Sequence, residues 1–142
     1  MKSGAQILEK LASECGLSLQ AEHVQAFDRM GDELLIWNRR INLTSITSPK
    51  DIVIKHYIDS LTIVGLLRGD ESILDIGSGA GFPALPLKIV LPGLTVVSLD
   101  ATRKKIHFQR HVIRLLGLTG IAAIHDRVEN VAGTYGGQFE VI

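Results

Sequence analysis

An apolar run that stops abruptly at three glycines is the feature that most restricts the fold of this chain. Residues 73–76 are apolar at all but one position, and Gly77, Gly79 and Gly81 follow at every second position. A short apolar run bounded by glycines is typical of a buried parallel strand. Glycines between a strand and a helix let the backbone turn tightly and approach a ligand, toward which the helix amides point. The segment therefore predicts a strand, a ligand-binding loop and a helix in succession.

The same alternation continues downstream. Helical spacing resumes over residues 82–90, a second strand is expected over 94–100, a second helix over 102–116 and a third strand over 121–124. Strands and helices that alternate in this way predict the α/β class, with a Rossmann-like parallel sheet flanked by helices. Residues 139–142 indicate the start of a fourth strand. We expect the sheet to be truncated there, because proteins normally cover an apolar open edge.

The preceding residues show helical periodicity. Five apolar side chains recur three or four positions apart and so share one helical face: Phe27, Met30, Leu34, Trp37 and Ile41. Ser48, Pro49 and Asp51 match a helix start, with a serine cap, a proline at the first helical position and an acid in the first turn. That helix is expected to run toward Leu67. We therefore expect an N-terminal helical extension, residues 1–70, that packs on a ligand-binding core, residues 71–142.

Composition excludes several classes of protein. Lysine plus arginine and aspartate plus glutamate both number 15 in 142 residues, so the formal net charge is zero and any RNA-binding surface must be local. Cys15 is the only cysteine, which excludes an internal disulfide, and the five histidines are scattered, so we expect no metal site. No apolar run approaches the roughly 18 residues that span a bilayer, and the sequence after Met1 does not resemble a signal peptide. We expect a soluble, cytoplasmic protein without a membrane partner.

Acidic residues follow each of the three expected strands. The carboxyl ends of parallel strands meet at one edge of a sheet, so these residues should converge on one ligand. Asp100 lies about 20 residues past the glycines, where a carboxylate accepts hydrogen bonds from ribose hydroxyls. Residues 126–129 can frame an adenine, and Asp75 can bond to an ammonium group, directly or through water. Each acid alone has an alternative reading as a turn or helix-start residue.

Phe82 separates two classes of ligand. The dinucleotide-binding pattern has glycine at this position, where a large side chain would hinder helix–strand packing and the approach of a pyrophosphate. S-adenosylmethionine contains no pyrophosphate. The loop therefore favours S-adenosylmethionine over NAD as the cofactor, and a methyltransferase over a dehydrogenase.

The chain resembles the RsmG family, formerly called glucose-inhibited division protein B. The residues that carry the resemblance extend over nearly the whole chain: Asn42-Leu43-Thr44, His56, Asp59-Ser60-Leu61, the run from Asp75 to Pro83, Leu85-Pro86-Leu87, Asp100, Lys104-Lys105 and Arg127-Val128-Glu129. The resemblance implies a class I S-adenosylmethionine-dependent methyltransferase that methylates N7 of a guanine in 16S ribosomal RNA. It implies cofactor contacts from Gly77, Phe82, Asp100, Ala101, Thr102, Val128 and Glu129. The loop itself adds Asp75, Ser78, Gly79 and Gly81 as candidate cofactor contacts.

Two departures from the family pattern affect these expectations. Ala84 stands where the family usually has glycine, a small change that should preserve cofactor binding. The family pattern also continues into a Ser-Arg-Ala segment whose arginine helps to form the site, and this segment is not among residues 1–142. We therefore expect the chain to bind cofactor without full activity.

Candidate catalytic and RNA-binding residues follow from the resemblance and from charge. Guanine N7 carries a lone pair and no proton, so its methylation requires alignment rather than a general base. His56 and Asp59 are candidate catalytic residues by their place in the family motif; the alternative is a structural hydrogen bond between them. Candidate RNA contacts are a basic stripe at helical spacing and a basic pair beside Trp37: Arg103, His107, Arg110, Arg114, Arg39 and Arg40. Their alternative is a solvated helix face, and Trp37 itself is expected in the helical core.

Three other functions stay open at this point. The cofactor residues alone also fit a methyltransferase that acts on a small molecule or a protein. The absent arginine segment makes a non-catalytic cofactor- or RNA-binding module a further alternative, whereas Phe82 disfavours an NAD-dependent enzyme. For the leading interpretation we expect 16S ribosomal RNA or the 30S subunit as partner, and a monomeric protein.

Overall fold

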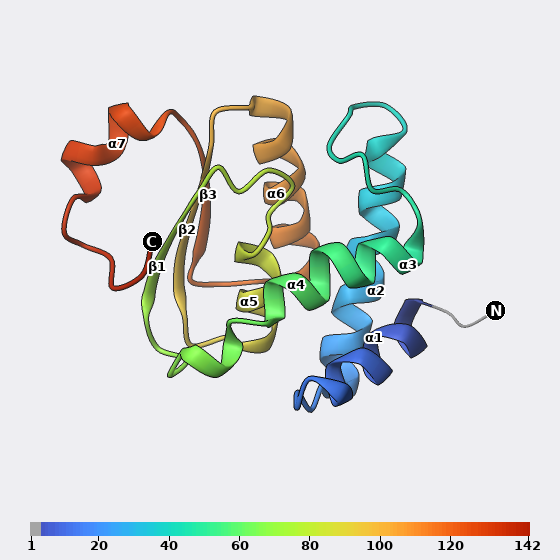
Figure 1. Ribbon diagram of the computed structural model, residues 1–142. Coiled ribbons are helices and arrows are strands. Elements are labelled where there is room, and N and C mark those ends of the chain that lie inside the picture. The colour runs from blue at the N-terminus through green and yellow to red at the C-terminus, as the bar shows by residue number, and fades with distance from the viewer. Residues whose placement is uncertain (1–3) are drawn as a thin grey trace.

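A parallel sheet forms the centre of the computed structural model, which describes residues 4–142 (Figure 1). Its strands are β1 (Ser72–Ile76), β2 (Thr95–Asp100) and β3 (Ile121–His125), hydrogen-bonded in the order β1-β2-β3. The three predicted strands and their parallel arrangement are confirmed. The predicted α/β class is confirmed as well.

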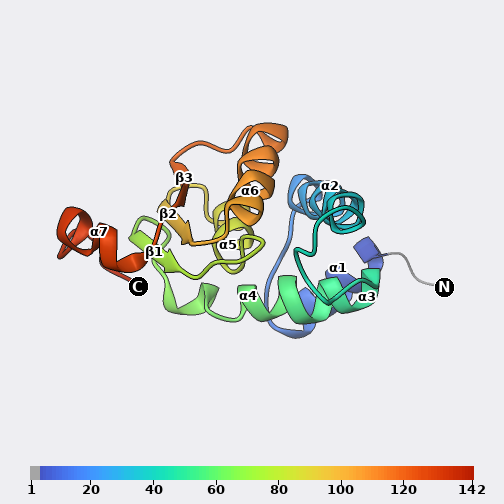
Figure 2. The same cartoon turned by 90° about the horizontal axis from the view of Figure 1, so that it is seen from above.

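Helices cover both faces of this sheet (Figures 1 and 2). On one face lie α5 (Ala84–Val90) and α6 (Arg103–Leu116), and on the other lies α7 (Val128–Tyr135). Alternate strand residues point to opposite faces, so Ile73 packs with the α5 side chains and Leu74 packs with Val131 of α7. Gly117 ends α6 in the left-handed conformation, with φ 63°, as its position after the helical run predicts.

The last residues pair with β1 rather than with β3. Val141 forms a parallel bridge with Ile73, and the Leu74 amide donates to the Val141 carbonyl at 2.9 Å. The strand predicted over residues 139–142 is therefore present as a single bridge. β2 and β3 lie on one side of β1, and Val141 pairs with β1 on its other side. The direction in which successive segments are added to the sheet therefore reverses at β1. In open α/β sheets such a reversal is where ligands bind.

Before the sheet, the chain forms two longer helices and one irregular helical segment. The longer helices are α1 (Gly4–Glu14) and α2 (Ala21–Asn38). Residues 49–66 then form α3 (Pro49–Asp51), the π-helix η1 (Ile52–Ile58), α4 (Asp59–Leu61) and the 3₁₀ turn η2 (Val64–Leu66). Ser48 caps this segment as predicted, since its hydroxyl accepts from the Asp51 amide at 3.1 Å.

The prediction of one regular helix from Pro49 to Leu67 is wrong. The middle of the segment is π-helical, and continuous helix ends at Leu61. Two side-chain hydroxyls compete with the backbone amides for the carbonyls of this segment. Ser60 donates its hydroxyl to the His56 carbonyl at 2.5 Å, and Thr62 donates to the Asp59 carbonyl at 2.6 Å. Such local bonds loosen or end helices, and apolar spacing does not reveal them.

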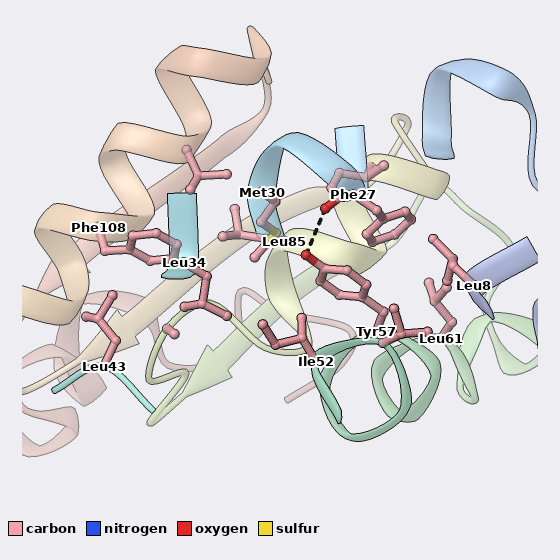
Figure 3. Packing of buried hydrophobic residues seen from close by; sticks show 14 residues of the cluster. Leu8, Phe27, Met30, Leu34, Leu43, Ile52, Tyr57, Leu61, Leu85 and Phe108 are labelled. Carbon is pink, nitrogen blue, oxygen red and sulfur yellow. Dashed lines mark hydrogen bonds between the residues drawn. The ribbon is translucent and has the colours of Figure 1, made fainter. Parts of the chain in front are cut away.

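One hydrophobic core joins the N-terminal helices to α5 and α6 (Figure 3). Met30 and Leu34 of α2 are fully buried in the same cluster as Leu85 of α5 and Phe108 of α6. Trp37 is partly buried and packs edge-on against Phe108, with ring centroids 5.6 Å apart, so it lies between α2 and α6. The division of the chain at position 70 stays a prediction, and residues 1–3 of the expected extension lie outside the described residues.

Within residues 4–142, no helix is both long enough and apolar enough to cross a bilayer.

Removing a core side chain of α2 tests this joint core. Leu34→Ala should lower the free energy of unfolding by about 2–5 kcal/mol, because Leu34 is 0% exposed and its loss leaves a cavity. Ile36→Ala is the matched control, since Ile36 lies on the same helix and is 50% exposed. Denaturant unfolding of both variants measures the difference. Equal losses for the two would contradict a core formed by this face of α2.

Candidate functional site

Three loops meet at the carboxyl edge of the sheet and enclose a cavity of about 190 Å³. The loops follow β1, β2 and β3, as the sequence predicted. Two apolar side chains flank the cavity and stay partly open to solvent, Ile76 at 43% and Val128 at 37% exposure. The lining residues are Ile76, Gly77, Leu99, Asp100, Ala101, Asp126, Arg127, Val128 and Glu129.

The glycines between β1 and α5 serve two different purposes. Gly77 and Gly79 have φ 68° and 61°, and a β-carbon built on either would meet no atom within 4 Å. Both positions therefore have open space beside them, and Gly77 lines the cavity. Gly81 has φ 108°, and a β-carbon there would collide with Leu85, whose Cγ lies at 2.8 Å. Close packing of the loop against α5 thus depends on Gly81, which leaves the next position free to hold Phe82.

Asp100 ties two of the three loops together. One carboxylate oxygen accepts from the Gly79 amide and the other from the Thr102 amide, each at 2.8 Å. The side chain is only 8% exposed. Asp100 lines the cavity, and its role as a cofactor contact stays a prediction. Its bonds to the backbone of both loops were not foreseen, and each oxygen keeps one further lone pair for a ligand.

Asp75 lies behind the glycine loop at the end of β1. Its Oδ2 accepts from the Ala84 amide at 3.1 Å. Burial raises the pKa of Asp75 to about 6; the negative charge of Asp100 acts in the same direction, and the bond from Ala84 opposes it. Asp75 therefore carries a carboxylate that would be stabilised by a nearby cation.

Sequence reasoning missed a buried polar network beneath the glycine loop. Gln109 of α6 is fully buried, and its Nε2 donates to the Gly79 carbonyl at 2.7 Å and to Ser78 Oγ at 2.8 Å. The Ser98 hydroxyl donates to Gln109 Oε1 at 2.6 Å. One signal was available: Gln109 lies three residues from Ile106 and from Val112, on the apolar face of its helix. A polar side chain on a buried face needs such partners.

On the opposite side of the loop, His56 of η1 contacts Phe82. The two rings are stacked, with centroids 4.1 Å apart and planes 7° from parallel. The hydroxyl of Thr44 lies 3.1 Å from His56 Nε2. Burial lowers the pKa of His56, against the opposing effect of Asp59. The structure therefore brings His56, one of the two candidate catalytic residues, to the loop, where it bonds to Thr44 instead of forming the alternative hydrogen bond with Asp59. Asp59, the second candidate, is exposed.

The third loop presents one free and one occupied carboxylate. Asp126 Oδ1 accepts from the Arg127 amide and from Asn130 Nδ2, each at 2.8 Å, and these bonds lower the pKa of Asp126. Glu129, in the first turn of α7, is exposed beside the cavity. Glu129 and the backbone of Val128 are thus placed where the sequence predicted an adenine contact.

Comparison with known proteins assigns the family. Residues 23–142 match the family model described as rRNA small subunit methyltransferase G. The chain belongs to this family. Two relatives named ribosomal RNA small subunit methyltransferase G are 46% identical over 140 residues, in Geobacter sp. (strain M21), and 50% identical over 125 residues, in Geobacter sulfurreducens. These alignments cover 99% and 88% of this chain, but the chain spans only 64% and 58% of the relatives' own lengths.

Solved structures agree with this assignment at the level of the fold. A protein-L-isoaspartate O-methyltransferase superposes with a TM-score of 0.56 at 18% identity, over 88% of this chain and 42% of its own. A second structure of this kind, from Plasmodium falciparum and in complex with S-adenosyl-L-homocysteine, superposes with a TM-score of 0.53 at 16% identity. The match covers 92% of this chain and 66% of that protein. The predicted Rossmann-like methyltransferase fold is therefore confirmed.

In this member of the rRNA small subunit methyltransferase G family, the predicted basic residues fall into two groups. Arg39, Arg40 and Arg103 lie where α2 ends and α6 begins, at the same end of the molecule as the cavity loops (Figure 1). The stripe then continues along α6, away from that end, through His107 and Arg110 to Arg114. All six side chains are exposed, and Arg110 also donates to the Ala123 carbonyl at 2.9 Å. The solvated-face alternative thus stays open for the distal part of the stripe.

Over residues 4–142, no group of three or more histidine, cysteine, aspartate or glutamate side chains is arranged to hold a metal ion.

The raised pKa of Asp75 predicts an unusual pH dependence of stability. In the folded protein Asp75 keeps its proton up to about pH 6, whereas in the unfolded chain it ionises near about pH 4. The folded state therefore binds more protons between these values, and its contribution to stability falls as the pH rises from about 4 to about 6. Asp75→Asn keeps an acceptor for Ala84 and cannot ionise, so the variant should lack this fall.

Thermal unfolding across that pH range measures the effect. Asp70→Asn is the control, because Asp70 is an exposed carboxylate whose side chain contacts Arg68. It should keep the wild-type pH dependence. Parallel curves for wild type and Asp75→Asn would show that burial does not disfavour the ionised carboxylate.

Proposed function

We propose that this chain is the cofactor-binding part of an S-adenosylmethionine-dependent methyltransferase that methylates N7 of a guanine in 16S ribosomal RNA. The observation that carries the proposal is the open space over Gly77 and Gly79 at the junction of three strand-end loops, each of which presents a carboxylate or a backbone amide. Family membership gives the substrate class, because the matched relatives are named for modification of small-subunit ribosomal RNA.

The residues that line the cavity, with others of the adjoining loops, can contact each part of this cofactor. Asp100 keeps free lone pairs for the ribose hydroxyls, and Val128 with Glu129 can hold the adenine by apolar contact and hydrogen bonds. Ile76 supplies a second apolar surface. Asp75 is a partly buried carboxylate that the cofactor's ammonium group would stabilise in its charged form. Ala101, Thr102 and Ser78 complete the proposed contacts through the loop backbone.

The proposed reaction needs no general base. Guanine N7 carries a lone pair and no proton, so it can accept a methyl group without removal of a proton. When bound, S-adenosylmethionine supplies the methyl group. The role of the chain is to hold the reactants in line and to place its carboxylates and dipoles where positive charge moves from sulfur to the base. His56 is not required as a proton acceptor, and its lowered pKa leaves it neutral near pH 7.

The partner assignment rests on charge and on family. Arg39 and Arg40 follow α2 and Arg103 begins α6. The end of α2 and the start of α6 lie at the same end of the molecule as the strand-end loops (Figure 1), so these exposed arginines can contact phosphates of 16S ribosomal RNA or of the 30S subunit. Such contacts make binding weaker as salt is raised. We propose a cytoplasmic, monomeric protein with a helical extension at residues 1–70 and a cofactor core at 71–142.

Calorimetric titration tests the cofactor class. The chain should bind S-adenosylhomocysteine and should not bind NAD, because Phe82 occupies the position where a dinucleotide loop needs glycine. Binding of NAD without binding of S-adenosylhomocysteine would overturn the proposal.

A matched pair of glycine substitutions locates the cofactor. Gly77→Ala should weaken binding of S-adenosylhomocysteine about tenfold or more, because the added methyl group enters the proposed cofactor space. Gly16→Ala is the control, since Gly16 has a similar φ of 77° and equally open surroundings far from the site. Both variants should lose about 1–2 kcal/mol of stability from the left-handed conformation. Equal affinities for the two variants would exclude Gly77 from the site.

Activity is tested on the longer protein that contains this chain. Incubated with methyl-labelled cofactor and either 16S ribosomal RNA or 30S subunits, it should place label on N7 of a guanine. Label on another atom, or on protein or small molecules only, would reject the RNA assignment.

A further inference from the structure

The contact between His56 and Phe82 joins the N-terminal helical segment to the glycine loop. We infer that His56 and Thr44 are positioning residues that hold the Phe82 ring, and with it the glycine loop, in the conformation that binds the cofactor. This inference rests on the proposed function, because it concerns the cofactor affinity of that same site. It gives His56 a role different from that of a catalytic acid or base.

The backbone of η1 directs neighbouring side chains to different parts of the fold. A π-helix over Ile52–Ile58 changes the direction in which successive side chains leave the helix, and π-helical turns are frequent at functional sites. Here two neighbouring residues point to different partners. Tyr57 donates its hydroxyl to the Phe27 carbonyl of α2 at 2.8 Å, while His56 lies flat on Phe82. The irregular turn thus fastens this segment to α2 and to the glycine loop.

The rings of His56 and Tyr57 both contact the Phe82 ring. Centroids 4.1 Å apart and planes 7° from parallel place the whole face of His56 against Phe82, and Tyr57 lies beside the same ring with its centroid at 6.1 Å. Phe82 directly follows Gly81, where a β-carbon would collide with Leu85, so the loop backbone packs closely on α5 beside the ring. Because Phe82 belongs to the loop itself, contacts that fix its ring also restrict the backbone that precedes it.

Thr44 fixes the imidazole of His56. The Thr44 hydroxyl lies 3.1 Å from His56 Nε2 and also accepts from the Ile46 amide at 3.1 Å. Asn38, the last residue of α2, accepts from the Leu43 and Thr44 amides at 2.8 and 3.0 Å. The orientation of the imidazole is thus fixed by bonds that begin at the end of α2. One imidazole nitrogen is occupied by Thr44 and one ring face by Phe82, which suits a support rather than a proton carrier.

Four variants of the chain, titrated with S-adenosylhomocysteine at a temperature where each is folded, test the inference. His56→Ala removes the stacked ring and should raise the Kd about twofold to tenfold, the range expected for one aromatic contact. His56→Phe restores a flat ring without the bond to Thr44, and its Kd should stay closer to that of wild type than the Kd of His56→Ala. Thr44→Val keeps the shape of the side chain but removes the hydroxyl, with its bonds to His56 Nε2 and to the Ile46 amide, and should raise the Kd about twofold to fivefold.

Ser45→Ala is the control, because it removes the exposed hydroxyl next to Thr44. Its Kd should equal that of wild type. A purely structural role would lower the melting temperature of His56→Ala and leave the Kd of the folded protein unchanged, and that result would overturn the inference. A Kd for His56→Phe as high as that of His56→Ala would also overturn it. If His56→Ala does not fold, Thr44→Val decides: a Kd equal to that of Ser45→Ala overturns the inference. Wild type that fails to bind S-adenosylhomocysteine would instead refute the proposed function.

Discussion

The Asp100 carboxylate is the interaction on which the site depends, because it fixes the glycine loop and the start of α6 to the end of one strand. A carboxylate that accepts two backbone amides at 2.8 Å orients both loops at once. Bonds of this kind to an ionised group are among the stronger hydrogen bonds in proteins. Asp100 also lines the cavity, so the side chain that orients these two loops lies at the cavity itself. Asp100 thus shapes the site through the backbone as well as offering lone pairs to a ligand.

The glycine loop is otherwise a weak structural element, since its residues supply little side-chain packing of their own. It is held from three sides: by Asp100 at the strand end, by Gln109 from beneath, and by His56 through Phe82. Each of these comes from a different part of the chain. A loop that is held before the ligand arrives loses less conformational freedom on binding, so these contacts favour affinity without touching the ligand.

Periodicity and glycine placement predicted the sheet, its helices and the edge where the site lies, because those depend on local residue patterns. Asp75 and Asp100 were assigned to the site from their position after strands. The π-helix at Ile52–Ile58 could not be predicted in this way, since it depends on hydroxyl bonds at single residues and on tertiary packing of Tyr57. The same holds for the partner of His56, because Thr44 is twelve residues away and the contact exists only once the chain is folded.

The packing of the helical extension on the core depends on the apolar outer faces of α5 and α6 as well as on the extension's own apolar residues. Both helices bury one face on the sheet and carry large apolar side chains on the other, among them Leu85 and Phe108, which are fully buried in one cluster with Met30 and Leu34 of α2. Exposing such side chains to water costs about 1.5–3 kcal/mol each. A sheet and its crossover helices would therefore expose an apolar surface without α2. Once α2 is required for burial, the segment that follows it is brought over the glycine loop, which is how residues far from the sheet in sequence come to lie at the site.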